Sequence, residues 1–95
     1  MIVVSAQNGL ITINGHAGYA EVGKDIVCAG VTALMQTLIQ SIEDLTGDVI
    51  QYNIIPGRAD IHYGNLSEAG QLLVDSFFLG IRQIADEFPE YLKMI

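Results

Sequence analysis

The stretch GHAGYAEVGKDIVCAG holds the only cysteine of the chain and one of its two histidines. His16 and Cys28 stand at opposite ends of a segment that contains Gly18 and Gly23, and Asp25 precedes the cysteine by three residues. A thiol with a histidine nearby can act as a nucleophile with its own base, which is the pairing used for attack on a carbonyl carbon. These residue types therefore indicate nucleophilic catalysis by Cys28, with His16 as the base.

Each of these residues also has an ordinary structural role. A lone cysteine in an apolar helix usually serves packing, a histidine often ends a strand in solvent, and glycines are common in loops. Asp25 could be only a helix cap, and its charge would by itself oppose ionisation of the thiol. A metal site of His16, Cys28, Asp25 and His62 is a further alternative, but no short ligand spacing such as C-x-x-C supports it. Residue chemistry alone leaves these alternatives open.

The elements that must position these residues begin with a hairpin. Strands are predicted at Ile2–Ala6 and Leu10–Asn14, because both segments are rich in β-branched residues and an Asn-Gly turn lies between them. Alternation along the second strand, continued past its end, puts His16 on the polar face, opposite the isoleucines.

A long helix follows, with Asp25 as its N-cap and Gly47 closing it. Its apolar residues recur at helical spacing and form a stripe that suits packing on a sheet: Val27, Val31, Leu34, Met35, Leu38, Ile42 and Leu45. Cys28 then lies in the first turn, where the helix dipole favours a thiolate. Unpaired backbone N–H groups of that turn are also candidates to bind an oxyanion.

A second strand pair is predicted at Asp48–Ile55 and Arg58–Tyr63, joined by a Pro-Gly turn. Asn65 and Glu68 resemble a capping box at the start of a last helix, which Pro89 stops. Apolar positions of this helix include Ala69, Leu72, Leu73, Ile81, Ile84, Ala85 and Phe88. The order ββαββα indicates a single α+β domain over residues 1–95, in two layers, with a mostly antiparallel sheet and both helices on one face.

Composition narrows the function classes. Four basic against eleven acidic residues give a net charge of −7, which is a poor match for nucleic acid and suits a basic partner. The acidity also has a simpler explanation, because it keeps a small protein that is 51% hydrophobic soluble. A domain this small and this apolar suggests a dimer that hides extra surface. Phe77, Phe78 and Leu79 cannot all face one side of a helix, so some of them must contact the other helix or a dimer partner.

The N-terminus lacks the positive region of a signal peptide. The uncharged stretch Ile26–Ile42 is shorter than a bilayer span and is interrupted by polar residues. One cysteine cannot form an intramolecular disulfide. We therefore expect a cytoplasmic protein with no membrane association.

The GHA element, the glycine-containing loop and the run GKDIVCAGVTAL together resemble the ribosomal-processing cysteine protease family, Prp. The resemblance extends over the whole chain and implies that His16 and Cys28 are the catalytic pair, with Asp25 assisting. Thr32 stands where the family usually has serine. The loop that contains Gly18 and Gly23 would close over a peptide.

The resemblance also implies a substrate and an assembly. Members of that family are homodimers that remove an N-terminal extension from a bacterial large-subunit ribosomal protein, the twenty-seventh, by cutting after a pair of phenylalanines. A basic ribosomal precursor is then the expected partner, without direct nucleic-acid binding and with neither cofactor nor metal. The alternative is a non-catalytic dimeric interaction module associated with ribosome assembly, in which Cys28 is a core residue.

Overall fold

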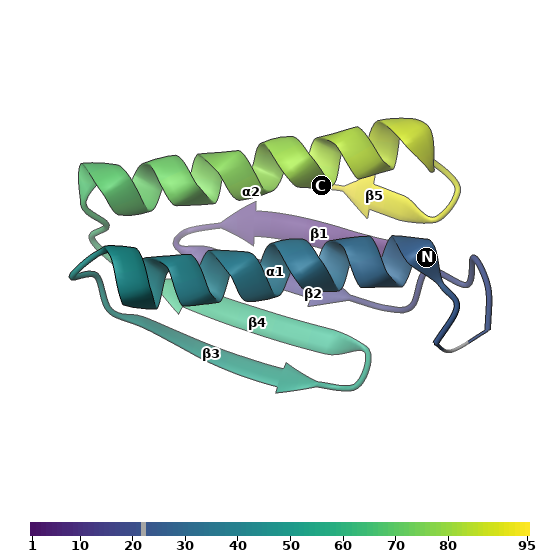
Figure 1. Ribbon diagram of the computed structural model, residues 1–95, viewed down its shortest axis with the longest axis horizontal. Helices are drawn as coiled ribbons and strands as arrows, with labels where there is room; N and C mark the ends of the chain where they lie inside the picture. Colours follow the sequence, from purple (N-terminus) through teal and green to yellow (C-terminus); the bar gives the residue numbers. More distant parts are fainter. Residues whose placement is uncertain (22) are drawn as a thin grey trace.

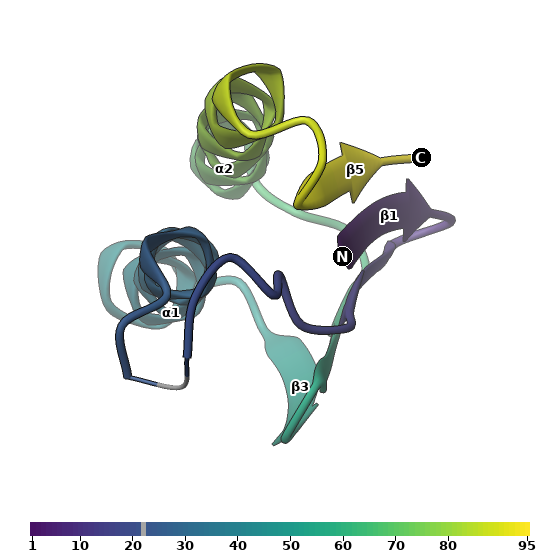
Figure 2. The ribbon, with the colours of Figure 1, turned by 90° about the vertical axis from the view of Figure 1, so that its right-hand side faces the viewer.

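Residues 1–21 and 23–95 are described by the computed structural model. The elements follow in the order β1 (Ile2–Gln7), β2 (Leu10–Asn14), α1 (Ile26–Leu45), β3 (Ile50–Ile55), β4 (Arg58–Tyr63), α2 (Glu68–Glu87) and β5 (Leu92–Met94). The strands form one sheet in the order β3-β4-β2-β1-β5, antiparallel except that β5 pairs parallel to β1. Both helices lie on the same side of this sheet (Figures 1 and 2). The α+β prediction with two helices on one face is therefore confirmed.

The core fills the space between the helices and the inner face of the sheet. Ile11 and Ile13 on β2 are both buried, as strand alternation predicts. The apolar stripe of α1 contributes Val27, Val31, Met35, Leu38, Ile39 and Ile42. The stripe is shorter than predicted, because Leu45 at the end of the helix is 72% exposed.

The two helix ends nearest β3 differ from the prediction. α1 is not closed by Gly47: Thr46 takes extended backbone, and both its N–H and its hydroxyl donate to the Ile42 carbonyl. The capping box at Asn65 and Glu68 is also wrong, because the N-cap of α2 is Ser67.

Asp48 explains the change of cap. Its carboxylate accepts hydrogen bonds from both the N–H and the hydroxyl of Ser67, and the Ser67 hydroxyl oxygen accepts from the Gly70 N–H. Asp48 is thus engaged at the start of α2, so β3 begins at Ile50 and not at residue 48. A contact with Asp48, distant in the sequence, thus accompanies capping by Ser67 and not by Asn65 two residues earlier.

β5 was not predicted. After α2 ends, the Phe88 carbonyl accepts from the N–H groups of Tyr91 and Leu92, and the chain turns back to the edge of β1. Leu92 lies beside Ile2 and is buried. The sheet therefore gains a short parallel strand, which covers the outer edge of β1 over Leu92–Met94.

The faces of α2 follow the expected pattern only in part. Ala69 and Leu72 are exposed and do not belong to the core. Phe77 is buried, Phe78 is half-buried and packs edge-to-face on it with ring centroids 5.2 Å apart, and Leu79 is 56% exposed. The three consecutive apolar residues thus divide between core and surface.

By length and mean hydropathy alone, α1 would be long and apolar enough to cross a membrane. The core helix of a folded domain has the same properties, and the inward side of α1 packs against the sheet and α2.

The prediction that Asp25 caps α1 is confirmed. One carboxylate oxygen, Oδ1, accepts from the N–H groups of Val27 and Cys28, each at 3.0 Å. The other, Oδ2, accepts from Tyr19 and Ala20 in the preceding loop, at 2.9 and 3.3 Å. The hydrogen bond from Cys28 lowers the pKa of Asp25 below its ordinary value of 3.8, burial opposes this, and the other three hydrogen bonds add to the lowering.

This arrangement predicts a specific loss of stability in acid. Because the folded pKa of Asp25 is depressed, its contribution is complete above pH 3.8 and is lost as pH falls through the folded pKa. Asp25→Asn retains one acceptor oxygen, whereas Asp25→Ala retains none, so we expect the order wild type, Asn, Ala in stability at pH 7. Urea unfolding between pH 7 and 2.5 should show the advantage of wild type over Asp25→Asn shrinking below pH 4. An advantage that stays constant over this range would contradict the role given to the charge.

Candidate active site

His16 reaches the site because β2 ends two residues before it. Gly15 takes φ +98° and donates its N–H to the Gly57 carbonyl at 2.8 Å, so strand alternation does not extend to His16. The prediction that His16 lies on the polar face is therefore wrong. Its imidazole lies over the turn between β3 and β4, where a Cβ built on Gly57 would come within 2.9 Å of Nε2.

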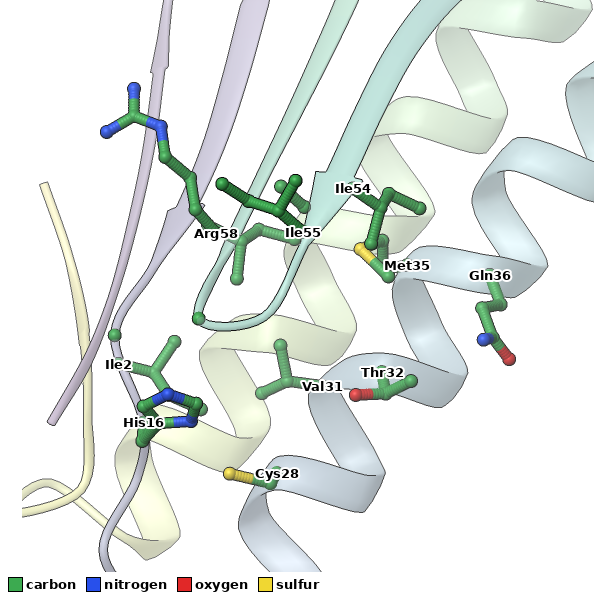
Figure 3. Close-up of a pocket in the computed structure, with 14 residues that line it drawn as sticks. Ile2, His16, Cys28, Val31, Thr32, Met35, Gln36, Ile54, Ile55 and Arg58 are labelled. Atoms are coloured by element: carbon green, nitrogen blue, oxygen red, sulfur yellow. The ribbon is translucent and has the colours of Figure 1, made fainter.

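Cys28 lies in the first turn of α1, as predicted, and is half-buried. The backbone N–H of Ala17, a buried residue, donates to its sulfur at 3.4 Å. Figure 3 shows the sulfur turned toward the His16 ring and the Thr32 hydroxyl turned into the same space. The sequence-predicted pair is thus brought together from two elements, the end of the hairpin and the start of the helix.

Two cavities meet at this pair. The first, of about 280 Å³, lies between the sheet and α1 and has apolar walls that include Ile2, Ile13, Val31, Met35 and Ala59. The second, of about 660 Å³, lies between α1 and the loop, where Gly18, Ala20 and Gly23 border it. Four residues line both cavities: His16, Cys28, Thr32 and Gln36. The thiol therefore has open space on two sides, one apolar and one bounded by the loop.

The first limb of the loop is fixed by contacts that the sequence did not indicate. The Tyr19 ring packs edge-to-face on Phe88 and on Tyr91, with centroids 5.4 and 5.1 Å apart. The Tyr19 N–H is held by Asp25, as described above. Gly18 and Gly23 have φ of +70° and +88°, the left-handed region that favours glycine. Asp25 and Tyr19 together fix the loop against both α1 and the end of α2.

Two of the first-turn N–H groups are not free to bind an oxyanion. Those of Val27 and Cys28 donate to Asp25 Oδ1, which corrects the prediction that they remain available. The Ala17 N–H, which points at the sulfur, is a donor beside the position that an attacked carbonyl would take.

The alternative metal site is not assembled. His62 is exposed on β4, where it pairs with Leu10 and Gln51, and it lines neither cavity next to Cys28. Within residues 1–21 and 23–95, no group of three or more His, Cys, Asp and Glu side chains is placed to hold a metal ion.

Sequence reasoning missed Ala17, Tyr19 and Gly57 as parts of the site. The sequence predicted a turn at Pro56 and Gly57, and in the structure Gly57 takes a φ of +77°. Nothing in the local sequence indicated that this turn supports the imidazole, because His16 and Gly57 are distant in the chain.

The chain matches known proteins over nearly its whole length. Residues 1–93 match the family model described as "Cysteine protease Prp". Relatives named "Ribosomal processing cysteine protease Prp" include one from Staphylococcus aureus, 25% identical, with 88% of this chain and 82% of the relative covered. Another, from Bacillus subtilis, is 27% identical, with 86% of this chain and 80% of the relative covered.

Solved structures agree with this assignment. The essential ribosomal processing protease Prp of S. aureus, in complex with a covalently linked product peptide, has a TM-score of 0.92 and 25% identity, with 99% of this chain and 97% of that chain covered. The protein SMU.848 of Streptococcus mutans has a TM-score of 0.77 and 29% identity, covering 99% and 91%. With a thiol and an imidazole at the junction of two cavities in the same fold, the chain belongs to the Prp family of cysteine proteases.

Proposed function

We propose that this chain removes the N-terminal extension of a bacterial large-subunit ribosomal protein, the twenty-seventh, by cutting after a pair of phenylalanines. The observation that carries the proposal is the position of Cys28 and His16 at the meeting point of two cavities, each bordered by both residues. Relatives with this fold are named for ribosomal processing, and an S. aureus relative was solved with a substrate peptide. The apolar first cavity suits an aromatic side chain, and Met35 adds a sulfur contact to its wall.

The chemistry follows from the pair. The Cys28 sulfur attacks the carbonyl carbon of the scissile bond while its proton passes to His16. His16 then protonates the leaving amine, and the N-terminal fragment remains as a thioester on Cys28. A water molecule that loses a proton to His16 hydrolyses the thioester and restores the thiol. During both steps the Ala17 N–H stabilises the oxyanion, and Asp25 acts by holding the loop and the helix start together.

We also propose that the enzyme works as a cytoplasmic homodimer without direct contact to nucleic acid or membrane. Ribosomal proteins are synthesised in the cytoplasm, and their precursors are basic, which suits a chain of net charge −7. Exposed leucines at positions 45, 72 and 79 offer apolar surface for a second copy. Sedimentation velocity on the purified chain measures the oligomeric state directly.

The proposed roles of Cys28 and His16 predict the effect of replacing either residue. Cys28→Ala and His16→Ala should each lower kcat/KM for the ribosomal precursor on the order of 10⁴-fold or more, because a nucleophile and its base act as a unit. Mass spectrometry of the precursor measures cleavage, and thermal unfolding checks that both variants remain folded. Cleavage by Cys28→Ala at a rate near that of wild type would exclude the proposed function.

Gly57 gives a second prediction. Gly57→Ala places a methyl group against His16 Nε2, and a displacement of about 1 Å in a catalytic group can cost about 100-fold in rate. The left-handed backbone adds a stability loss of about 1–2 kcal/mol. Gly23→Ala is the matched control for that loss, since its φ is +88° and no atom lies within 4 Å of the added Cβ. NMR signals of the His16 ring should shift in Gly57→Ala and not in Gly23→Ala, and equal effects of the two would rule out the proposed support.

We also propose that the loop containing Gly18 and Gly23 closes over a bound peptide, and this gives a third prediction. Amides of Tyr19 and Ala20 should exchange slowly in the free enzyme, since both donate to Asp25. The amide of exposed Gly23 should be slowed only when a peptide aldehyde occupies Cys28, because closure then covers it. Hydrogen exchange followed by NMR measures both limbs. If the exchange rate at Gly23 is the same with and without the aldehyde, the loop does not close.

A further inference from the structure

The sheet ends in β5 on one side and in β3 on the other, and the edge of β3 lies beside the active site. β5 covers the outer edge of β1, whereas β3 is the last strand on the other side. Ile54 and Ile55, at the end of β3, line the first cavity together with Cys28 and His16. An open edge offers unpaired backbone groups to another extended chain.

The register tells which backbone groups are free. Hydrogen bonds from Gly15 to Gly57 and from Tyr63 to Gly9 show that the odd-numbered residues of β4 bond toward β2. In an antiparallel ladder the bonding direction alternates, so the even-numbered residues of β4 bond toward β3. Their partners on β3 are Gln51, Asn53 and Ile55. The N–H and C=O groups of Tyr52 and Ile54 therefore point away from the sheet, to the open edge.

A groove runs along this edge from the thiol. A third cavity, of about 450 Å³, lies between α1 and β3 and is lined by Gln36, Gln40, Tyr52 and Ile54 among others. It shares Gln36 and Ile54 with the first cavity, so the two adjoin. Figure 3 shows Ile54 of β3 and Met35 of α1 facing each other where they join.

The sheet side of the groove is apolar, and the helices leave its side chains partly exposed. Tyr52 and Ile54 point toward α1 yet are 48% and 47% exposed. On the helix, Cys28, Thr32, Gln36 and Gln40 succeed one another every four residues and so form one row. From Cys28 to Gln40 this row extends about 18 Å, at about 1.5 Å per residue. That length holds about five residues of extended chain.

We propose that the substrate peptide on one side of the scissile bond adds to β3 as an extra strand. Its backbone bonds to the N–H and C=O groups of Tyr52 and Ile54, and alternate side chains enter the groove against α1. The proposal rests on the proposed function, since the position of the groove next to the Cys28 cavity is the reason to assign it to the substrate. A second copy of the chain pairing edge to edge is the competing occupant.

Tyr52→Pro tests the backbone bond. Proline at position 52 removes the N–H that points to the open edge and leaves the hydrogen bonds between β3 and β4 intact. An edge strand tolerates proline at such a position. Tyr52→Ala removes the same side chain and keeps the N–H, and Gln51→Ala alters the opposite face of the strand as a control. For a peptide with at least five residues on each side of the cut, we expect kcat/KM to fall about three- to tenfold further in Tyr52→Pro than in Tyr52→Ala. For the shortest peptide that is still cleaved, the two variants should be equal.

A second measurement needs no altered protein. Substrate peptides N-methylated at one position each should lose kcat/KM at every second residue on one flank of the cut, because alternate amides of an added strand face β3. The proposal is overturned if Tyr52→Pro and Tyr52→Ala are equal on the long peptide, or if N-methylation shows no alternation on either flank. A dimer that becomes a monomer in Tyr52→Pro, by sedimentation velocity, would assign the edge to a second copy. Cys28→Ala is measured in the same assay. Cleavage of the peptide by this variant would signal that the proposed function is wrong, and this result is distinct from every outcome described for Tyr52.

Discussion

The site depends on one carboxylate that accepts four backbone hydrogen bonds. Asp25 joins the loop, through Tyr19 and Ala20, to the first turn of α1, through Val27 and Cys28. Because His16 precedes the loop and Cys28 follows it, this junction helps to set the distance between the imidazole and the thiol. The same bonds use the N–H groups that a helix start usually offers to a ligand. In the proposed mechanism the oxyanion is bound instead by the Ala17 N–H, which donates to the sulfur.

Two glycines, Gly15 and Gly57, position His16 beside the thiol. Gly15 ends the strand alternation at a positive φ, which turns His16 from the polar face of the sheet into the space beside α1. Gly57 leaves room for the imidazole on the neighbouring turn, and its carbonyl holds Gly15 in place. The histidine is thus supported by a hairpin that is distant in sequence. The residues that support His16 therefore differ from Gly18 and Gly23, the glycines of the loop that we propose to close over a peptide.

The sequence allowed prediction of the features that depend on neighbours along the chain. The two hairpins, both long helices and the cap at Asp25 follow from alternation, helical spacing and turn residues. The pair of His16 and Cys28 was predicted from residue types and from the family resemblance, whereas strand alternation placed His16 on the wrong face. Features decided by contacts across the sheet were missed or wrong. Ser67 displaces Asn65 as a cap because Asp48 binds it, and β5 is too short to have a pattern of its own.

The missed strand also explains why one edge of the sheet is available for function. β5 pairs with β1 and becomes one edge strand of the sheet, whereas the other edge strand, β3, is the one whose residues line the cavity of the thiol. Two helices cover the middle of a five-stranded sheet and leave the inner face of β3 half-exposed at Tyr52 and Ile54. An exposed apolar edge ordinarily favours aggregation, and proteins usually protect it with charge or proline. Here the edge carries no charged residue from Ile50 to Ile55 and runs into the cavity of the thiol, which is the condition an extended substrate requires.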